Sequence, residues 1–182
     1  MRRTVLPVLV LLVIPAASFC SEFDLGLRWA GLKVEWNELD GSDVESRWDW
    51  CWQMFLDFWP ASWFAVGLEF GWADFPVESE RSEEHESVEV QQRAVWQEGA
   101  LRLGVAPLNE VVRPAVFVKT RYAWADFDVG FGDRAFWVLA GELKMDLLVS
   151  PDIGLFAFGE YGMALSGEFA EEALGGGLML RF

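Results

Sequence analysis

The sequence predicts an all-β fold, an eight-stranded antiparallel up-and-down transmembrane β-barrel. Three observations predict it. Eight segments alternate between apolar residues on one face and charged or small residues on the other. The last of them, Glu171–Phe182, ends the chain on an aromatic residue. After residue 18 no apolar run approaches the ~20 residues of a membrane-spanning helix, although the chain is 53% hydrophobic and holds 11 Trp.

Each alternating segment is long enough for one tilted strand across a bilayer, which takes roughly 9–11 residues. The segments are Phe23–Trp36, Arg47–Phe58, Trp63–Asp74, Val95–Val105, Arg113–Trp124, Arg134–Leu148, Ile153–Met163 and Glu171–Phe182. In the first segment the apolar set shifts after Trp29 to Leu32, Val34 and Trp36. This shift predicts a β-bulge near Ala30–Gly31.

The connections between segments are of two kinds. Three are short and contain proline: Trp59–Ser62, Ala106–Val112 and Val149–Asp152. Three are longer, polar and acidic: Asn37–Ser46, Pro76–Ala94 and Asp126–Asp133; the last connection, Ala164–Ala170, is shorter than these. Transmembrane barrels combine tight periplasmic turns with longer external loops. An even number of strands then places both termini in the periplasm.

The two faces of the segments predict which side meets lipid. One face carries no charged side chain, and the other mixes charged residues with Gly and Ala. A narrow lumen needs small residues to make room for long charged ones, and ions in a low-dielectric interior must pair. The predicted lumen charge network comprises Arg28, Asp49, Asp57, Glu69, Arg102, Lys119, Arg121, Glu142, Lys144, Glu160 and Arg181.

Tryptophans near the segment ends predict aromatic girdles at the two membrane interfaces. The residues concerned are Trp36, Trp48, Trp50, Trp59, Trp63, Trp72, Trp124 and Trp137.

The N-terminus predicts a secretory signal peptide at residues 1–18, with cleavage within two residues of that point, and a barrel domain at 19–182. Arg2 and Arg3 precede a short apolar core, and small residues follow at 16–18. Phe19 disfavours lipoprotein processing at Cys20. A Cys20–Cys51 disulfide is not expected, because the two residues would lie about 20 Å apart along the strands. Cleavage changes the formal charge of −15 to about −17, which excludes nucleic acid as a partner.

The closing segment resembles the signal that the barrel-assembly machinery reads, with Leu178, Leu180 and Phe182 on one face. In size and layout the chain resembles the small eight-stranded outer-membrane β-barrels of the OmpA and OmpX type. This resemblance implies the outer membrane of a Gram-negative-type bacterium. It also implies lipid and lipopolysaccharide as surroundings, and the barrel-assembly machinery as a partner during biogenesis.

Candidate chemistry is sparse. The pair His85 and Ser87 resembles the His-x-Ser pair of outer-membrane lipid A deacylases, but the flanking residues do not match and the pair falls in an expected loop. The acidic residues around it lack the spacing of a Ca²⁺ loop. No catalytic, metal or cofactor site is therefore expected.

We expect a plugged barrel with a structural or surface-interaction role. Eight strands enclose about the volume that side chains can fill. A narrow channel for small molecules, an enzyme acting on envelope lipid and a periplasmic lipocalin-like binder are the alternatives.

Overall fold

The computed structural model describes residues 22–39, 42–46, 48–83, 86–107, 111–127 and 133–182. The expected signal peptide and Cys20 lie outside these residues, as does His85. The strands are β1 (Glu22–Leu39), β2 (Ser42–Ser46), β3 (Asp49–Ala61), β4 (Phe64–Glu83), β5 (Glu86–Val105), β6 (Val112–Phe127), β7 (Arg134–Leu148), β8 (Ile153–Ala164) and β9 (Phe169–Arg181). No helix in the described part of the chain is long and apolar enough to cross a membrane.

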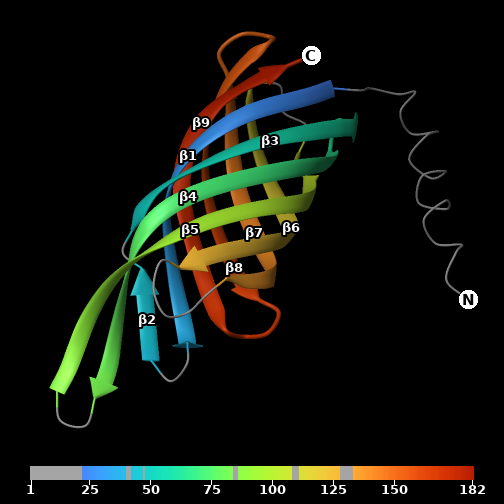
Figure 1. Ribbon diagram of the computed structural model, residues 1–182. Helices are drawn as coiled ribbons and strands as arrows, with labels where there is room; N and C mark the ends of the chain where they lie inside the picture. Colours follow the sequence, from blue (N-terminus) through green and yellow to red (C-terminus); the bar gives the residue numbers. More distant parts are fainter. Residues whose placement is uncertain (1–21, 40–41, 47, 84–85, 108–110, 128–132) are drawn as a thin grey trace, which may run out of the picture.

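Eight of these strands close into an antiparallel barrel, which confirms the predicted fold class. Each strand from β3 to β9 pairs with the next, β1 pairs with β3, and β1 also pairs with β9 to complete the cylinder. The main chains of Phe23 and Phe182 exchange two hydrogen bonds of 3.1 and 3.0 Å. The start of β1 and the C-terminus therefore lie side by side at one end of the barrel, which we call the terminal end (Figure 1).

The opposite end, which we call the loop end, is extended by strands where loops were expected. The predicted loop Pro76–Ala94 instead continues β4 and β5, which stay paired from Phe64↔Val105 to Glu83↔Glu86. The predicted loop Asn37–Ser46 contains β2, which pairs with both β1 and β4. These hairpins protrude from the barrel in Figure 1. The two loop predictions rested on polar and acidic composition, and they failed because a strand that projects into water has the same composition as a loop.

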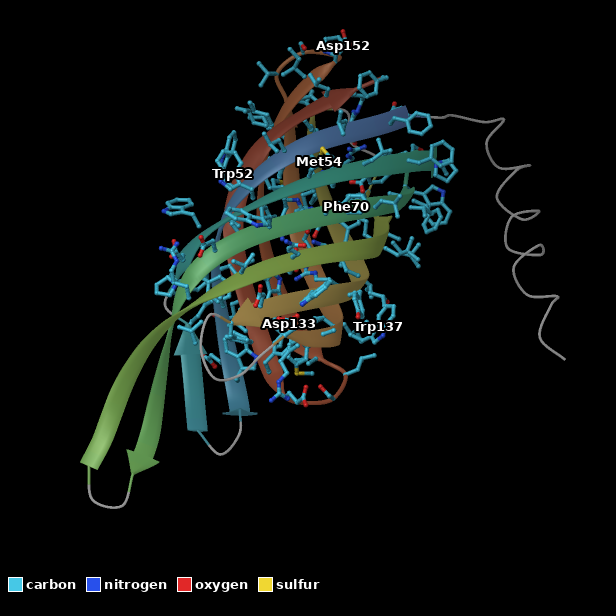
Figure 2. All side chains as sticks on the ribbon, in the orientation of Figure 1. Trp52, Met54, Phe70, Asp133, Trp137 and Asp152 are labelled. Carbon is cyan, nitrogen blue, oxygen red and sulfur yellow. The ribbon has the colours of Figure 1, made fainter. Side chains whose placement is uncertain are left out.

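The predicted outward face is apolar on every barrel strand. Leu25, Met54, Leu68, Leu103 and Leu143, for example, are all exposed on the outside of the cylinder. Figure 2 labels Trp52, Met54 and Phe70, which share this face on the neighbouring strands β3 and β4. Side chains of the opposite phase are buried inside.

The predicted bulge in β1 is wrong. The pairing of β1 with β3 is continuous from Glu22 to Leu32, and its pairing with β9 is continuous from Asp24 to Trp36. Between Glu22 and Trp36 the alternation does not slip; instead, the polarity of the two faces inverts. Leu32, Val34 and Trp36 point inward and are buried.

This inversion extends around the loop end of the barrel. The interior there is an apolar cluster, which we call the aromatic cap, comprising Leu32, Val34, Trp36, Phe75, Val77, Trp96, Phe127, Phe136, Val138 and Phe169. The outward positions at the same level include Lys33, Glu35, Asp74, Arg93, Asp126 and Glu172. An apolar interior with a charged exterior is the pattern of a protein in water. The sheet therefore continues past the outward apolar belt into a section whose two faces have the opposite polarity.

Candidate functional site: the charged lumen

The middle of the lumen is filled by ion pairs between residues from different strands. Glu142 on β7 is one centre: its carboxylate lies 2.7 Å from Arg28 Nη1, 2.8 Å from Arg102 Nη2 and 2.5 Å from Lys119 Nζ. All four side chains are inaccessible to solvent. Strands β1, β5, β6 and β7 are thus joined across the lumen by a single carboxylate.

Glu69 on β4 binds the same three cations from another side. It lies 3.0 Å from Arg28 Nη2, 2.9 Å from Arg102 Nη1 and 2.9 Å from Lys119 Nζ. Arg102 Nε is also 3.1 Å from Asp57 on β3. Each guanidinium therefore bridges two or more carboxylates, which suits its planar arrangement of donors.

A second group of ions lies next to the aromatic cap. Arg121 pairs with Glu160 and Glu171 and lies 3.1 Å from Glu98. Glu98 also accepts hydrogen bonds of 2.8 Å from the Trp96 indole and from Gln53. Trp96 thereby connects the ionic layer to the cap.

A third group closes the terminal end. Asp24 pairs with Arg113 and lies 2.9 Å from Arg181 Nε. The Trp59 indole N–H donates to Asp24 at 2.9 Å. Arg113 reaches Asp146 at 3.0 Å, and Asp146 continues to Lys144 at 2.9 Å and so to the middle of the lumen. The ionic network thus runs from the terminal end of the barrel to the aromatic cap.

Aromatic rings fill the space that the ions leave. The Arg28 guanidinium lies 4.5 Å from the Phe158 ring centroid, and the Arg102 guanidinium lies 4.0 Å from that of Phe117. Lys144 Nζ lies 4.4 Å above Phe55. Desolvated cations gain the most from such contacts. These rings compensate part of the cost of removing the cations from water.

Glycines provide the room for this packing. A Cβ atom added at Gly104 would lie 2.2 Å from the Phe117 ring, and one at Gly26 would lie 2.1 Å from the Phe55 ring. Larger residues at these positions would expel the rings that cover the cations.

The structure brings ten of the eleven predicted network residues together within the barrel. The exception is Asp49, at the first residue of β3, which accepts a 2.7 Å hydrogen bond from the Trp50 amide. The sequence placed Asp24, Glu98 and Asp146 on the inward face without assigning them to the network, and it missed Arg113, Glu171 and Gln53. The alternation could have identified two of them, because residues an even number of positions apart on a strand share a face. Arg113 lies on the same face as Lys119, and Gln53 lies on the same face as Asp57.

The structure places six of the eight predicted girdle tryptophans on the outside of the barrel. Trp48, Trp50, Trp63, Trp72, Trp124 and Trp137 are exposed on the outer face. The prediction is wrong for Trp36 and Trp59, which are 3% and 1% exposed and point inward. Trp36 packs in the aromatic cap against Phe127, and the Trp59 ring lies 4.0 Å from the Arg113 guanidinium.

Cys51 is a buried free thiol. Among the described residues, no group of three or more His, Cys, Asp or Glu side chains could hold a metal ion. The ion pairs in the lumen join side chains of different strands across the barrel.

No protein-family model matches the sequence, and no characterised protein matches it at the sequence level. Solved structures do match. Neisserial surface protein A shares 11% identity at a TM-score of 0.63, covering 88% of this chain and 97% of that one. Ail of Yersinia pestis shares 15% at 0.60, covering 89% and 99%. The N-terminal β-barrel domain of Pseudomonas aeruginosa OprF shares 10% at 0.61, covering 89% and 97%.

At these identities the similarity establishes the fold alone. The fold is that of the small eight-stranded outer-membrane β-barrels, and the predicted resemblance is confirmed.

Proposed function

We propose that this chain is an outer-membrane protein whose closed, ion-filled barrel supports the envelope and presents the loop end at the cell surface. The observation that carries the proposal is the reversed polarity of the membrane section. Its outside is an apolar belt and its inside is an ionic network. Only a lipid environment makes that arrangement favourable.

The proposed orientation places the terminal end in the periplasm and the loop end outside. The connections β3–β4 and β7–β8 at the terminal end are tight, whereas the β1–β2 and β4–β5 hairpins extend the loop end (Figure 1). This asymmetry is the one that outer-membrane barrels show.

We propose that the lumen does not conduct. Glu142 and Glu69 hold three cations across its middle, and the aromatic cap lies above. A solute would have to separate these pairs and leave buried charges without partners, at a cost of about 3–5 kcal/mol for each broken pair.

Planar-bilayer recording tests this property. The reconstituted mature chain should give no steady single-channel currents. Steady currents that change when Glu142 or Arg121 is replaced would contradict a plugged lumen and favour the narrow-channel alternative. If no currents are seen, the heat-dependent gel mobility of the same samples should verify that the barrel is folded.

Tag accessibility tests the orientation. An epitope inserted between Glu84 and His85 should be labelled by antibody on intact cells. The same epitope inserted between Asn109 and Glu110 should be labelled only after the outer membrane is permeabilised. The opposite pattern would refute the proposed orientation.

We expect that the external partner of this chain is not a sulfated polyanion. One structure of Yersinia pestis Ail is a complex with the heparin analogue sucrose octasulfate. The present chain has a formal charge of −15, and its longest hairpin is rich in glutamate. Like charges disfavour the same ligand here.

For biogenesis, we propose that the barrel-assembly machinery reads the outward face of β9. Leu178, Leu180 and Phe182 all lie on that face, and Phe182 is 66% exposed at the edge of the terminal end. These side chains are accessible to a partner before the barrel enters lipid.

A further inference from the structure

Three buried carboxylates share one guanidinium directly below the aromatic cap. Arg121 on β6 pairs with Glu160 on β8 and Glu171 on β9, and it lies 3.1 Å from Glu98 on β5. We call these four side chains the Arg121 group. All of them are almost completely buried. A carboxylate removed from water needs a cation or hydrogen-bond donors of its own, so three carboxylates around one guanidinium are costly when all are ionised.

The neighbouring ions do not supply the missing positive charge. The middle of the lumen has equal numbers of cations and carboxylates, namely Arg28, Arg102 and Lys119 with Asp57, Glu69 and Glu142. Lys119 also reaches Glu160, but it shares its charge with the two carboxylates of the middle group. The Arg121 group therefore has an excess of negative charge when every carboxyl group is ionised.

The three carboxylates differ in the hydrogen bonds that they accept. Both oxygens of Glu98 are occupied, one by a side-chain amide and the other by the Trp96 indole, each at 2.8 Å. Both oxygens of Glu160 are occupied by cations. Glu171 binds Arg121 through Oε1 alone, and its Oε2 is buried with no hydrogen-bond partner. An anionic oxygen is unfavourable in that position, whereas a hydroxyl group is tolerated at much lower cost.

We propose that Glu171 holds a proton on Oε2 at neutral pH and that this proton keeps the aromatic cap closed. With the proton bound, two anions face Arg121 and the Lys119 ammonium. When the proton passes to the solvent at the loop end, a third anion forms at the base of the cap. Repulsion among the three carboxylates in a poorly solvated interior then acts against the packing above them. Glu171 is thus a pH-sensitive latch between the ionic network and the cap.

Glu171 is enclosed by the cap that it controls. It pairs with Val34 on β1 and with Gly162 on β8. A Cβ atom added at Gly162 would lie 2.6 Å from Glu171 Oε1 and 3.1 Å from Val138. Val34 and Val138 both belong to the cap, as does Phe169, which lies two residues earlier on the same face of β9. A negative charge on Glu171 therefore forms against the apolar residues of the cap.

The surroundings of Glu171 favour its protonated form. Burial raises the pKa of the Glu171 carboxyl group from its ordinary value of 4.5 to about 8, and this effect outweighs the attraction of Arg121. Glu172, the next residue, is exposed outward, so this level lies beyond the apolar belt. The other strands face the Arg121 group with the following charged or ionisable side chains: Arg28, Cys51, Glu69, Lys119 and Glu142.

Urea unfolding of the full mature chain in liposomes tests the proton. Between about pH 5 and 8 the folded chain keeps a proton that the unfolded chain has released, so the unfolding constant should rise about tenfold for each pH unit. Glu171→Gln keeps an uncharged polar group of the same shape and should remove this slope. Glu172→Gln, the exposed neighbour, is the matched control and should keep the native slope. A native chain without the slope would overturn the proposal.

Difference infrared spectra test where the proton lies. The native chain and Glu172→Gln should show the carbonyl band of a protonated carboxyl group that disappears between about pH 7 and 9.5. Glu171→Gln should lack this pH-dependent band, and its persistence in that variant would place the proton elsewhere. Failure of Glu171→Gln to give the heat-dependent gel mobility of a folded barrel would equally overturn the proposal, because the amide imitates the protonated carboxyl group.

Indole ¹H–¹⁵N spectra test the effect on the cap. Raising the pH from about 7 to 9.5 should shift the signal of Trp96, whose N–H donates to Glu98. The signal of Trp59, whose N–H donates to Asp24 at the terminal end, should stay in place. In Glu171→Gln both signals should stay in place. A Trp96 shift of the same size in that variant, or no shift in the native chain, would overturn the latch.

Discussion

At the residue scale, the lumen shows how buried ions are made tolerable. A buried charge is costly unless several partners bind it. Arg28, Arg102 and Lys119 each contact both Glu69 and Glu142. A one-residue slip of any strand would move its ion to the apolar outer face. The network therefore favours a single strand register.

Replacing Glu142 with Gln tests this dependence. The substitution leaves three cations with one anionic partner fewer, so the free energy of unfolding should fall by about 3–5 kcal/mol. Urea unfolding in liposomes measures it. Glu172→Gln is the control, because Glu172 is exposed on the outer face and should have little effect. Equal losses in the two variants would contradict the network.

A second residue-scale prediction concerns the belt. Leu103 and Val118 are paired outward residues of β5 and β6. Leu103→Arg or Val118→Arg should each cost about 2–4 kcal/mol near the middle of the bilayer. Ala135→Arg, at the level of the loop-end tryptophans, should cost about 0–1 kcal/mol. An unchanged unfolding midpoint for the first two would show that this face does not meet lipid.

At the element scale, the alternation of residues along each strand predicted more of the fold than the amino-acid composition did. The phase of all eight barrel strands followed from alternation alone. The same rule assigns Trp59 and Trp36 inward, and the error arose from judging them by nearness to a strand end. The inversion in β1 was interpreted as a bulge, because alternation fixes which residues share a face but not what each face meets.

The aromatic cap yields a prediction at this scale. Phe169 packs against Trp36, Trp96 and Phe136, with ring centroids 6.0, 5.4 and 4.8 Å away. Phe169→Ala should lower the free energy of unfolding by about 3–5 kcal/mol. Hydrogen exchange should rise chiefly at the loop end of β1 and β9. Its exposed neighbour provides the control, since Glu168→Ala should leave exchange unchanged.

At the scale of the whole molecule, closure depends on a contact between the two ends of the chain. Phe23 and Phe182 exchange main-chain hydrogen bonds where β1 meets β9. The sequence predicted this closure from the strand count. It could not predict the cation–aromatic packing, because alternation does not say which inward side chains will meet across the lumen.

Deleting Phe182 should slow assembly of the barrel, because both the aromatic side chain and the closing main-chain bonds are lost. Phe182→Ala keeps the main chain and separates the two effects. Pulse-chase analysis of the heat-modifiable form measures the rate. Normal surface levels of the deletion variant would refute a role for Phe182 in targeting.

If the chain is the outer-membrane protein proposed above, the inverted polarity of the loop end also fixes how deeply it lies in the bilayer. A bilayer that rose along the wall would draw the Asp74 and Asp126 carboxylates into hydrocarbon, and one that sank would leave the leucines below them in water. Membrane thickness is thereby matched to one narrow band of the cylinder. The same molecule would be strained in a thicker bilayer, and its stability should therefore vary with the acyl-chain length of the host lipid.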